Sequence, residues 1–587
     1  MIGPSSTQSL SLVSIDVGSV NTRAFFFDNV EGRYRFLAAG EAPSTIGAPA
    51  FDINLGVLEA IDQLQEFTGR TFLSDRGLLI SHENVDGVGA NAVGITFSGG
   101  PPLKVVTVGL LSEVSFDSVN KLVRSSYCHV VESLSLNDRR RPEAFIDAIC
   151  QTLPDLVVVA GGTNRGASRS VIRLVNYLAL ALNLIPENQR PHVLFVGNEN
   201  LQEEIDNLLG ALTTLLHSPN IRPNLDQESL GPALQILNTI YFEIQAKKLS
   251  GLKELRDLSE GQIRTPALSL GRVVRFLSNV IDAPKGMLGI DIGASNTLVA
   301  SAFAGDLQQR VFTDLGVGGS LPGMIAETHL AQIMRWLPYD LSEDFVLDYL
   351  HNKPMFARAL PASQEELAIE QAVARQVMRL AIGKSLDLFP PNAIYPLAGT
   401  VPWFDRILVS GSAVSKAPRM EQSLLIILDA LQPVGITTVI LDQNSLVNAV
   451  GVGAEIDPLL AVHVLESNSF INLGTVISPV GNTRGNGSAL LRIQIVREGR
   501  KEDVVEVREG GISTIPLSAG HVADVYVQPL QNVNIGLGPG RGGWVRRVVG
   551  GVFGLIIDAR GRPIQVPTSF NRRQEVLKTW QDALTRS

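Results

Sequence analysis

The chain has 587 residues, of which 45% are hydrophobic and 18% charged, a composition that excludes a disordered, collagen-like or coiled-coil protein. At roughly 150 residues a domain, this length predicts two to four domains, each able to bury its own core. The 49 basic and 58 acidic residues give a net charge of −9, which argues against a general nucleic-acid binder because such proteins are normally basic.

The cysteine count and the apolar runs predict a cytoplasmic protein. Cys128 and Cys150 are too few for a disulfide framework or a cysteine-only zinc site, so we expect reduced thiols. The first residues lack the basic start and long apolar core of a signal peptide. The longest apolar stretches, 171–184 and 548–557, are interrupted or too short to span a bilayer, and we expect no membrane partner.

The first element expected in the chain is a β-hairpin with a polar, glycine-containing turn. Residues 12–17 form an apolar strand, the turn 18–22 follows, and two further antiparallel strands are expected at 23–29 and 34–40. Glycine lets the backbone approach a ligand closely, and consecutive N–H groups form a concavity for anionic oxygens. Asp16, at the end of the first strand, can hold Mg²⁺ through its water shell.

The next 110 or so residues alternate buried strands with glycine-rich turns and helices. In chain order we expect the turn Ser98-Gly99-Gly100, a strand at 103–111, a strand at 155–160, the loop 161–166 with the sequence GGTNRG, a helix at 168–184, a strand at 193–197 that ends before Asn198, and a helix at 201–209.

The hairpin then recurs 275 residues after its first copy. Ile290-Asp291-Ile292-Gly293-Ala294-Ser295-Asn296-Thr297 repeats the eight residues from Ile15 to Thr22, and strands are expected at 287–292, 298–304 and 308–314. One such turn could be an ordinary hairpin. Two copies, in equivalent places of two half-chains, indicate a duplicated domain with a shared site between the halves.

Two small-residue segments follow the second hairpin. The run 407–413 reads as an apolar strand followed by the turn Gly411-Ser412, where a larger side chain would obstruct a ligand. A strand at 439–442 then precedes a helix of small residues at 444–453.

From about residue 456 the pattern changes to short β-rich runs with Gly/Pro turns, which predicts a β-sandwich or barrel. The clearest runs are 489–496, 503–507, 522–527 and 552–557, with a closing helix at 572–583.

The duplicated D-x-G-x-x-x-T hairpin resembles the actin, Hsp70 and sugar-kinase superfamily, in which two related domains clamp nucleotide phosphates between their hairpins. The resemblance implies an α/β fold of duplicated actin-like ATPase (RNase H-like) domains with a C-terminal mostly-β domain. The implied boundaries are 1–275, 276–455 and 456–587. The segment 444–453 would then be a connecting helix that packs against the first half.

The same resemblance implies ATP and Mg²⁺ as cofactors. The nucleotide would be bound by Gly18, Ser19, Asn21, Thr22, Gly293, Ser295, Asn296, Thr297, Gly411 and Ser412, with the last two near the adenosine. Asp16 and Asp291 would hold the metal, and Asp16, Asp291 and Asp314 are the candidate catalytic carboxylates.

A closer family is indicated by the order of SGG, VVTVGL, VVVAGGTNRG, LFVGNEN and DIG along the chain. This order is similar to the glutamate mutase accessory family, of MutL or GlmL type and unrelated to the mismatch-repair protein, over roughly residues 10–455. The resemblance implies an ATP-dependent accessory or reactivating factor, with the subunits of an adenosylcobalamin-dependent mutase as partners.

The second hairpin departs from the family pattern at two positions. Ala294 replaces a glycine, and Leu298 stands where the family has a final aspartate, so a ligand for Mg²⁺ or water is lost there. Asp314, expected at the end of the third strand of the same sheet, could replace it. In the 161–166 loop, Asn164 stands where an acidic residue is frequent.

These departures keep two alternatives open beside an ATP-hydrolysing factor. One is a non-catalytic nucleotide-binding scaffold that self-associates as a homo-oligomer. The other is a small-molecule kinase of the same superfamily, which would need a carboxylate base on its substrate side that the sequence does not identify.

Overall fold

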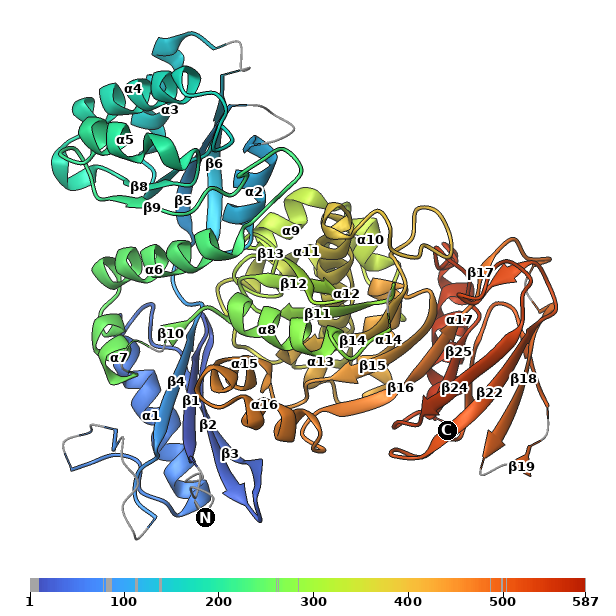
Figure 1. Cartoon of the computed structure of the whole chain (residues 1–587). Coiled ribbons are helices and arrows are strands. Elements are labelled where there is room, and N and C mark those ends of the chain that lie inside the picture. The colour runs from blue at the N-terminus through green and yellow to red at the C-terminus, as the bar shows by residue number, and fades with distance from the viewer. Residues whose placement is uncertain are drawn as a thin grey trace, which may run out of the picture.

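A computed structural model describes residues 10–585, apart from 76, 78, 81–86, 111–114, 137–139, 260, 262, 283, 486, 498–499 and 503, and without the side chains of 500–501. The described chain forms two sheets of one topology, a third sheet inserted into the first half, and a strand-rich C-terminal region (Figure 1). Every helix in the described ranges is too short or too polar to span a bilayer.

The first sheet is built around a fully buried central strand, β1, with the sequence LVSIDV. Its strand order is β10-β4-β1-β2-β3, with β1–β2 and β2–β3 antiparallel and β1–β4 and β4–β10 parallel. The strands are β1 (Leu12–Val17), β2 (Asn21–Val30), β3 (Arg33–Pro43), β4 (Ala92–Phe97) and β10 (Ile263–Arg264). Helix α1 (Ile53–Thr68) packs on β2 and β3.

The second sheet repeats this order and these directions in its first five strands, β15-β14-β11-β12-β13. They are β11 (Gly286–Ile292), β12 (Thr297–Phe303), β13 (Asp306–Phe312), β14 (Phe404–Ser410) and β15 (Gly435–Leu441). The duplicated α/β fold expected from the repeated hairpin is therefore confirmed, because both the hairpin and the strand order that follows it recur.

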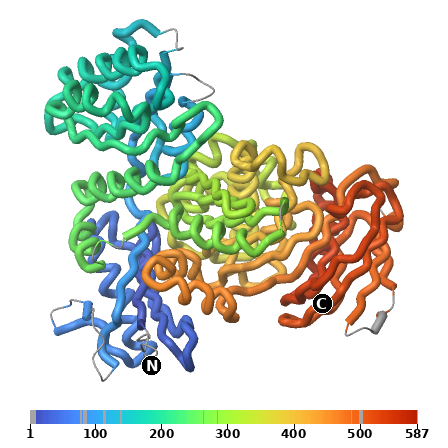
Figure 2. The backbone as a smooth tube through the Cα atoms, in the orientation of Figure 1, coloured from blue at the N-terminus to red at the C-terminus, as the bar shows by residue number. Residues whose placement is uncertain are grey.

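The inserted sheet is all-parallel and lies between β4 and β10 in the chain, with the order β6-β5-β7-β8-β9. Its strands are β5 (Leu103–Gly109), β6 (Cys128–Ser135), β7 (Leu156–Val159), β8 (His192–Phe195) and β9 (Leu215–His217). The backbone tube leaves the first sheet, builds this unit and returns through α6 (Gly231–Lys248) (Figure 2). The sequence indicated several of these strands without separating them from the first half.

The two faces of the inserted sheet belong to different cores. Alternate residues such as Val106 and Val157 pack with α3 (Pro142–Thr152), α4 (Arg169–Leu184) and α5 (Gln202–Leu209). Their neighbours Val105 and Val158 join the main core of the first half, together with buried residues of α2 (Asp117–Arg124) and α6. The insertion is therefore anchored on the first half through one complete face.

The C-terminal region continues the second sheet before it forms a sheet of its own. Strands β16 (Ile471–Ser478), β25 (Leu555–Asp558) and β21 (Ile512–Ile515) extend the second sheet beyond β15. A further sheet, containing β18 (Ala489–Arg497), β22 (Val522–Pro529) and β24 (Gly543–Val549), packs on this extension through a separate apolar core. Helix α17 (Phe570–Thr585) closes the chain.

The strand-rich C-terminal region expected from the sequence is confirmed, and its strands and closing helix lie close to the expected runs. Residue 503, where one expected strand begins, lies outside the described residues, and β20 covers Val505–Arg508. The domain boundary at 455 stays a prediction, because three strands beyond it are hydrogen-bonded into the sheet of the second half.

The two halves meet at a pair of helices that pack closely because a glycine lies at their contact. Helix α15 (Val447–Ile456), which overlaps the segment 444–453 expected to connect the halves, packs on β1, β4 and α8 (Pro266–Ser278). A Cβ atom at Gly451 would lie 2.3 Å from the backbone oxygen of Ser269, so only glycine permits this spacing.

We expect Gly451→Ala to lower the free energy of unfolding by about 2 kcal/mol, because the added methyl group forces α8 and α15 apart. Urea unfolding of the full chain measures the change. Gly383→Ala is the matched control, since a Cβ atom at this last residue of α12 (Gln364–Gly383) meets nothing within 4 Å. Equal stability of Gly451→Ala and the wild type would contradict the close helix contact.

Candidate active site

The two hairpin turns have the same backbone hydrogen bond at equivalent positions. Gly18 N–H donates to the oxygen of Asn21 at 3.0 Å, and Gly293 N–H donates to the oxygen of Asn296 at 2.8 Å. The strand registers also correspond, since Asp16 lies opposite Arg23 and Asp291 lies opposite Leu298. The sequence repeat is therefore a repeat of three-dimensional structure down to single hydrogen bonds.

The turns of the two halves contact each other directly. Ser295 Oγ donates to Ser19 Oγ at 2.9 Å, a hydrogen bond between residues 276 positions apart in the chain. The predicted site residues of the two hairpins are thus brought together, at the junction where α15 packs on β1.

Two further polar contacts cross the junction beside the turns. Arg23 Nη2 donates to Ser412 Oγ at 3.0 Å, and Lys416 Nζ donates to Glu41 Oε2 at 2.8 Å. Glu41 also accepts from Arg23 and, at 2.8 Å, from Asn21. The first hairpin therefore reaches the small-residue turn at Gly411-Ser412 through its arginine.

Asp16 lies buried at the end of β1, only 7% exposed. Burial raises the pKa of its carboxyl, although Thr96 Oγ1 donates to Asp16 Oδ1 at 2.5 Å and the charge of Arg23 acts in the opposite direction. Asn448, in the first turn of α15, is a further hydrogen-bond partner of this carboxyl.

Asp291 forms a carboxylate pair with Asp16. Burial, followed by the negative charges of Asp16 and Asp442, raises the pKa of Asp291 to about 7, while Arg23 and a hydrogen bond from Asn448 lower it. Asn448 therefore serves both carboxyls of the pair. Repulsion between two carboxylates at one place is relieved either by a shared proton or by a cation.

The pair fits a hydrated Mg²⁺ ion better than a protein-caged metal. Mg²⁺ commonly keeps several waters and takes one or two carboxylates, with phosphate oxygens filling other positions. In the described part of the chain, no group of three or more His, Cys, Asp or Glu side chains is suited to hold a metal. The role of Asp16 and Asp291 as metal ligands stays a prediction.

Asp442 and Asn448 are site residues that the sequence analysis did not single out. The carboxylate of Asp442 accepts from the backbone N–H groups of Leu446 and Val447, both at 2.8 Å, and from Ser410 Oγ at 3.1 Å. It thereby fixes the start of α15, on which Asn448 lies. An aspartate at a strand end before a helix is the sequence signal that could have indicated this role.

The turn at Gly411 lies against the end of β11. Gly411 has φ +114°, and a Cβ atom there would lie 2.3 Å from the backbone oxygen of Ile292. Glycine is therefore required at position 411, because the backbone of this turn lies very close to the backbone of Ile292 in the same half. Ser412, the first residue of α13 (Ser412–Ser415), is the partner of Arg23 described above.

The two threonines of the repeat lie behind the turns. Thr22 is 1% exposed, and its Oγ1 lies beside Gly56 of α1. Thr297 Oγ1 donates to the backbone oxygen of Leu315 at 2.9 Å. Both side chains contact neighbouring backbone of their own half, and their role as nucleotide ligands stays a prediction.

Asp314 is not brought into the carboxylate pair. It lies two residues beyond the end of β13, and the charged groups that act on Asp291 are Asp16, Asp442 and Arg23. Leu298, opposite Asp291 in the hairpin, is 2% exposed and belongs to the apolar core of the first half. The position is therefore used for packing between the halves.

Comparison with known proteins supports the family expected from the motifs. The family model described as MutL protein matches residues 12–469, which is more than half of the chain. No curated protein matches the chain.

Several solved structures are similar to the chain at low identity and low TM-score. Nucleotide-free acetone carboxylase has 13% identity and a TM-score of 0.31, with 87% of this chain and 82% of that chain covered. The diol dehydratase-reactivating factor in nucleotide-free form has 11% identity and a TM-score of 0.28, with 78% and 99% covered. The ATP-dependent caprolactamase from Pseudomonas jessenii has 11% identity and a TM-score of 0.32, with 87% and 81% covered. These TM-scores are low, so the fold assignment depends on the strand order and the duplicated hairpin.

Replacing one member of the carboxylate pair should change stability in a pH-dependent way. The pKa of Asp291 is about 7 in the folded chain and about 3.9 in an unfolded one, so the folded chain keeps a proton that the unfolded chain has released. Stability of the wild type therefore falls from pH 4 to pH 7 on account of this group, and then levels off. Asp291→Asn removes this loss.

We expect Asp291→Asn to match the wild type near pH 4 and to be more stable at pH 8 by an amount on the order of 2 kcal/mol. Urea unfolding at the two pH values measures the difference. Asp314→Asn serves as control because Asp314 lies outside the pair. A stability gain independent of pH, or a loss at pH 8, would contradict the coupling of Asp16 and Asp291.

Proposed function

The chain belongs to the MutL protein family, and from this premise we propose that it is an ATP-dependent accessory factor that reactivates an adenosylcobalamin-dependent mutase such as glutamate mutase. The observation that carries the proposal is the contact of two equivalent turns from two equivalent halves, with Asp16 and Asp291 beside it. A site shared between two halves can convert nucleotide binding into a change of shape, because its ligand binds differently to the open and closed arrangements.

The chain's own residues have separate tasks in this proposal. Backbone N–H groups of the turns at Gly18 and Gly293 would face the phosphates, as donors in a concavity made by successive residues. Asp16 and Asp291 would hold Mg²⁺ through water, which would neutralise their mutual repulsion. The bound ion would supply charge stabilisation for phosphoryl transfer. Gly411 and Ser412 would lie near the adenosine.

Phosphates between the turns require the present contacts to rearrange. The hydrogen bond from Ser295 to Ser19 occupies the space that separates the hairpins, and Ser412 is already bonded to Arg23. Nucleotide binding would therefore exchange contacts within the protein for contacts with the ligand. The halves would move about the α8–α15 pair, where Gly451 permits close approach.

The inserted sheet is placed to follow such a movement. Gln309 of β13 in the second half donates from Nε2 to the backbone oxygen of Ser125 at 2.9 Å, and Ser125 Oγ donates back to the oxygen of Gln309 at 3.1 Å. Ser125 directly follows α2, which packs under the inserted sheet. The insertion thus contacts both halves, and we propose that it presents the nucleotide-dependent change to the mutase in the cytoplasm.

Whether ATP is hydrolysed depends on a group that orients water. Asp314 is the third candidate for this task, with Asp16 and Asp291, although it lies outside their pair. The apolar Leu298 at the family's aspartate position favours the alternative of a nucleotide-binding scaffold without turnover, which would self-associate. Binding and hydrolysis are therefore tested separately.

Asp16→Asn tests the nucleotide site, since it keeps the size of the side chain and removes its charge. We expect the variant to lose at least tenfold in affinity for Mg-ATP by isothermal titration calorimetry and to lose reactivation of an inactivated glutamate mutase. Asp314→Asn should keep Mg-ATP affinity and affect only turnover.

Three outcomes distinguish the readings. Wild-type protein that binds no adenine nucleotide would refute the proposal and its alternative together. Binding without turnover, with filaments detected by light scattering, would support the scaffold. ATP-dependent mutase reactivation by the wild type, lost in Asp16→Asn, would support the accessory factor.

Locking the two turns together tests the required opening. In Ser19→Cys/Ser295→Cys, the two sulfur atoms would replace oxygen atoms 2.9 Å apart, so oxidation should form a disulfide. We expect the oxidised double variant to lose Mg-ATP binding and to regain it with dithiothreitol. Each single cysteine variant is the control, and full binding by the crosslinked protein would contradict nucleotide placement between the turns.

A further inference from the structure

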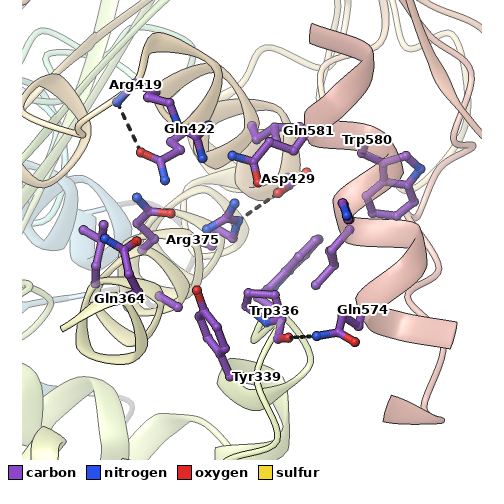
Figure 3. A pocket seen from close by; sticks show the side chains of 17 residues that line it. Trp336, Tyr339, Gln364, Arg375, Arg419, Gln422, Asp429, Gln574, Trp580 and Gln581 are labelled. Atoms are coloured by element: carbon purple, nitrogen blue, oxygen red, sulfur yellow. Dashed lines mark hydrogen bonds and ion pairs between the residues drawn. The ribbon is translucent and has the colours of Figure 1, made fainter. Parts of the chain in front are cut away.

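A cavity lies in the second half, where α17 packs beside α12 and α14. It has a volume of ≈ 260 Å³ and is bordered by α12, α14 (Met420–Leu431), α17 and the segment from Trp336 to Tyr339 (Figure 3). The volume exceeds that of several water molecules, at about 30 Å³ each, and suits a small organic molecule. None of the predicted nucleotide-site residues lines this cavity.

The cavity wall holds a buried donor without a partner. Gln371 of α12 is 9% exposed, and its Nε2 finds no hydrogen-bond partner among the described residues. An amide nitrogen left unpaired in the interior is destabilising, so a ligand that accepts a hydrogen bond there would recover this loss. Gln364, Gln422, Gln574 and Gln581 add four more side-chain amides to the wall.

The charge of the wall is positive. Arg375, Arg419 and Lys578 border the cavity, and Asp429 is the one acidic residue among those that line it. Both oxygens of Asp429 are already used, because Oδ2 accepts from Arg375 Nε at 2.8 Å and Oδ1 accepts from Arg560 at 2.6 Å. One of the dashed lines in Figure 3 joins Arg375 and Asp429.

Behind the wall the arginines outnumber the acidic groups, since Asp429 already pairs with both Arg375 and Arg560. Arg335 and Arg375 both lie over the ring of Trp336, at 4.8 and 5.5 Å from its centroid. Burial and the nearby charge of Arg379 lower the pKa of Arg335, although the charge of Asp429 acts in the opposite direction. Among the described residues, the buried atoms Arg335 Nε and Arg379 Nη1 have no hydrogen-bond partner. This surplus of cationic nitrogen favours an anionic ligand over a neutral or basic one.

Apolar side chains complete the wall and limit the ligand. Leu367, Leu425 and Leu577 line the cavity together with Trp336 and Trp580. The Trp580 ring is covered on one side by Arg560, 4.6 Å from its centroid. The occupant that matches these surfaces has oxyanionic groups joined by a short spacer.

We propose that this cavity, between α12, α14 and α17, binds a small molecule carrying carboxylate or phosphate groups, with Gln371, Arg375, Arg419 and Lys578 as its recognition residues. The site goes beyond the proposed nucleotide function and would operate in a chain that binds no ATP.

Helix contacts connect the cavity to the turn at Gly411-Ser412. Helix α13 packs on both α12 and α14, and Ser423 Oγ of α14 donates to the backbone oxygen of Val414 in α13 at 2.7 Å. Arg419 lies three residues after Lys416, which pairs with Glu41 of the first half. An anion that draws Arg419 inward would therefore act on the segment that contacts the first half.

The test is titration of the full chain with pyrophosphate and, separately, with succinate in a phosphate-free buffer. Calorimetry and tryptophan fluorescence measure the binding. We expect one of the two anions to bind, and the identity of that anion distinguishes a phosphate site from a carboxylate site. Gln371→Leu should weaken this binding at least tenfold, since it removes the unpaired donor and keeps the volume.

Lys578→Ala and Arg419→Gln change exposed residues at the cavity, so they test the proposal even if Gln371→Leu does not fold. Each should weaken binding about three- to tenfold. Arg572→Ala, at an exposed position of the same helix as Lys578 but outside the cavity wall, should leave binding unchanged. Absence of binding of both anions at millimolar concentration would overturn the proposal. So would binding that neither Lys578→Ala nor Arg419→Gln weakens.

Discussion

The carboxylate pair of Asp16 and Asp291 is the constraint around which the junction of the two halves is built. The buried Asp16 and the half-buried Asp291 repel each other, and the chain offsets this repulsion with Thr96, Arg23 and a shared Asn448. Asn448 depends in turn on Asp442, which fixes the start of α15. The helix that joins the halves and the groups that would hold a metal therefore depend on each other.

The duplicated halves and their hairpins could be predicted because their information is local. About 15 consecutive residues contain a strand, a Gly/Ser/Asn/Thr turn and a second strand. The second copy of this pattern, 275 positions later, identified the two related halves. The family resemblance implied that the two turns face a shared site, but the direct hydrogen bond between Ser295 and Ser19 was not predicted. Arg23, which reaches Ser412 across the junction, was missed because its partner lies 389 residues away in the sequence.

Other features depend on pairing between distant strands, which a single sequence does not specify. The apolar run Leu103–Gly109 indicates a buried strand, but nothing in it says that the strand joins a separate parallel sheet. Leu298 was read as a lost metal ligand, and the structure gives it a packing role at the junction. The cavity with Gln371 in its wall is lined by residues between 336 and 581, and no local sequence motif predicts such a site.

The strand order of the second sheet has a consequence for how the protein is made. Strand β16 pairs with β25, which ends at Asp558, and β21 pairs on the far side of β25. During synthesis the ribosome therefore releases β16 with an unpaired edge, and about 75 further residues must emerge before that edge is covered. Exposed edges recruit other strands, so the nascent chain passes through an aggregation-sensitive interval that the completed protein does not have.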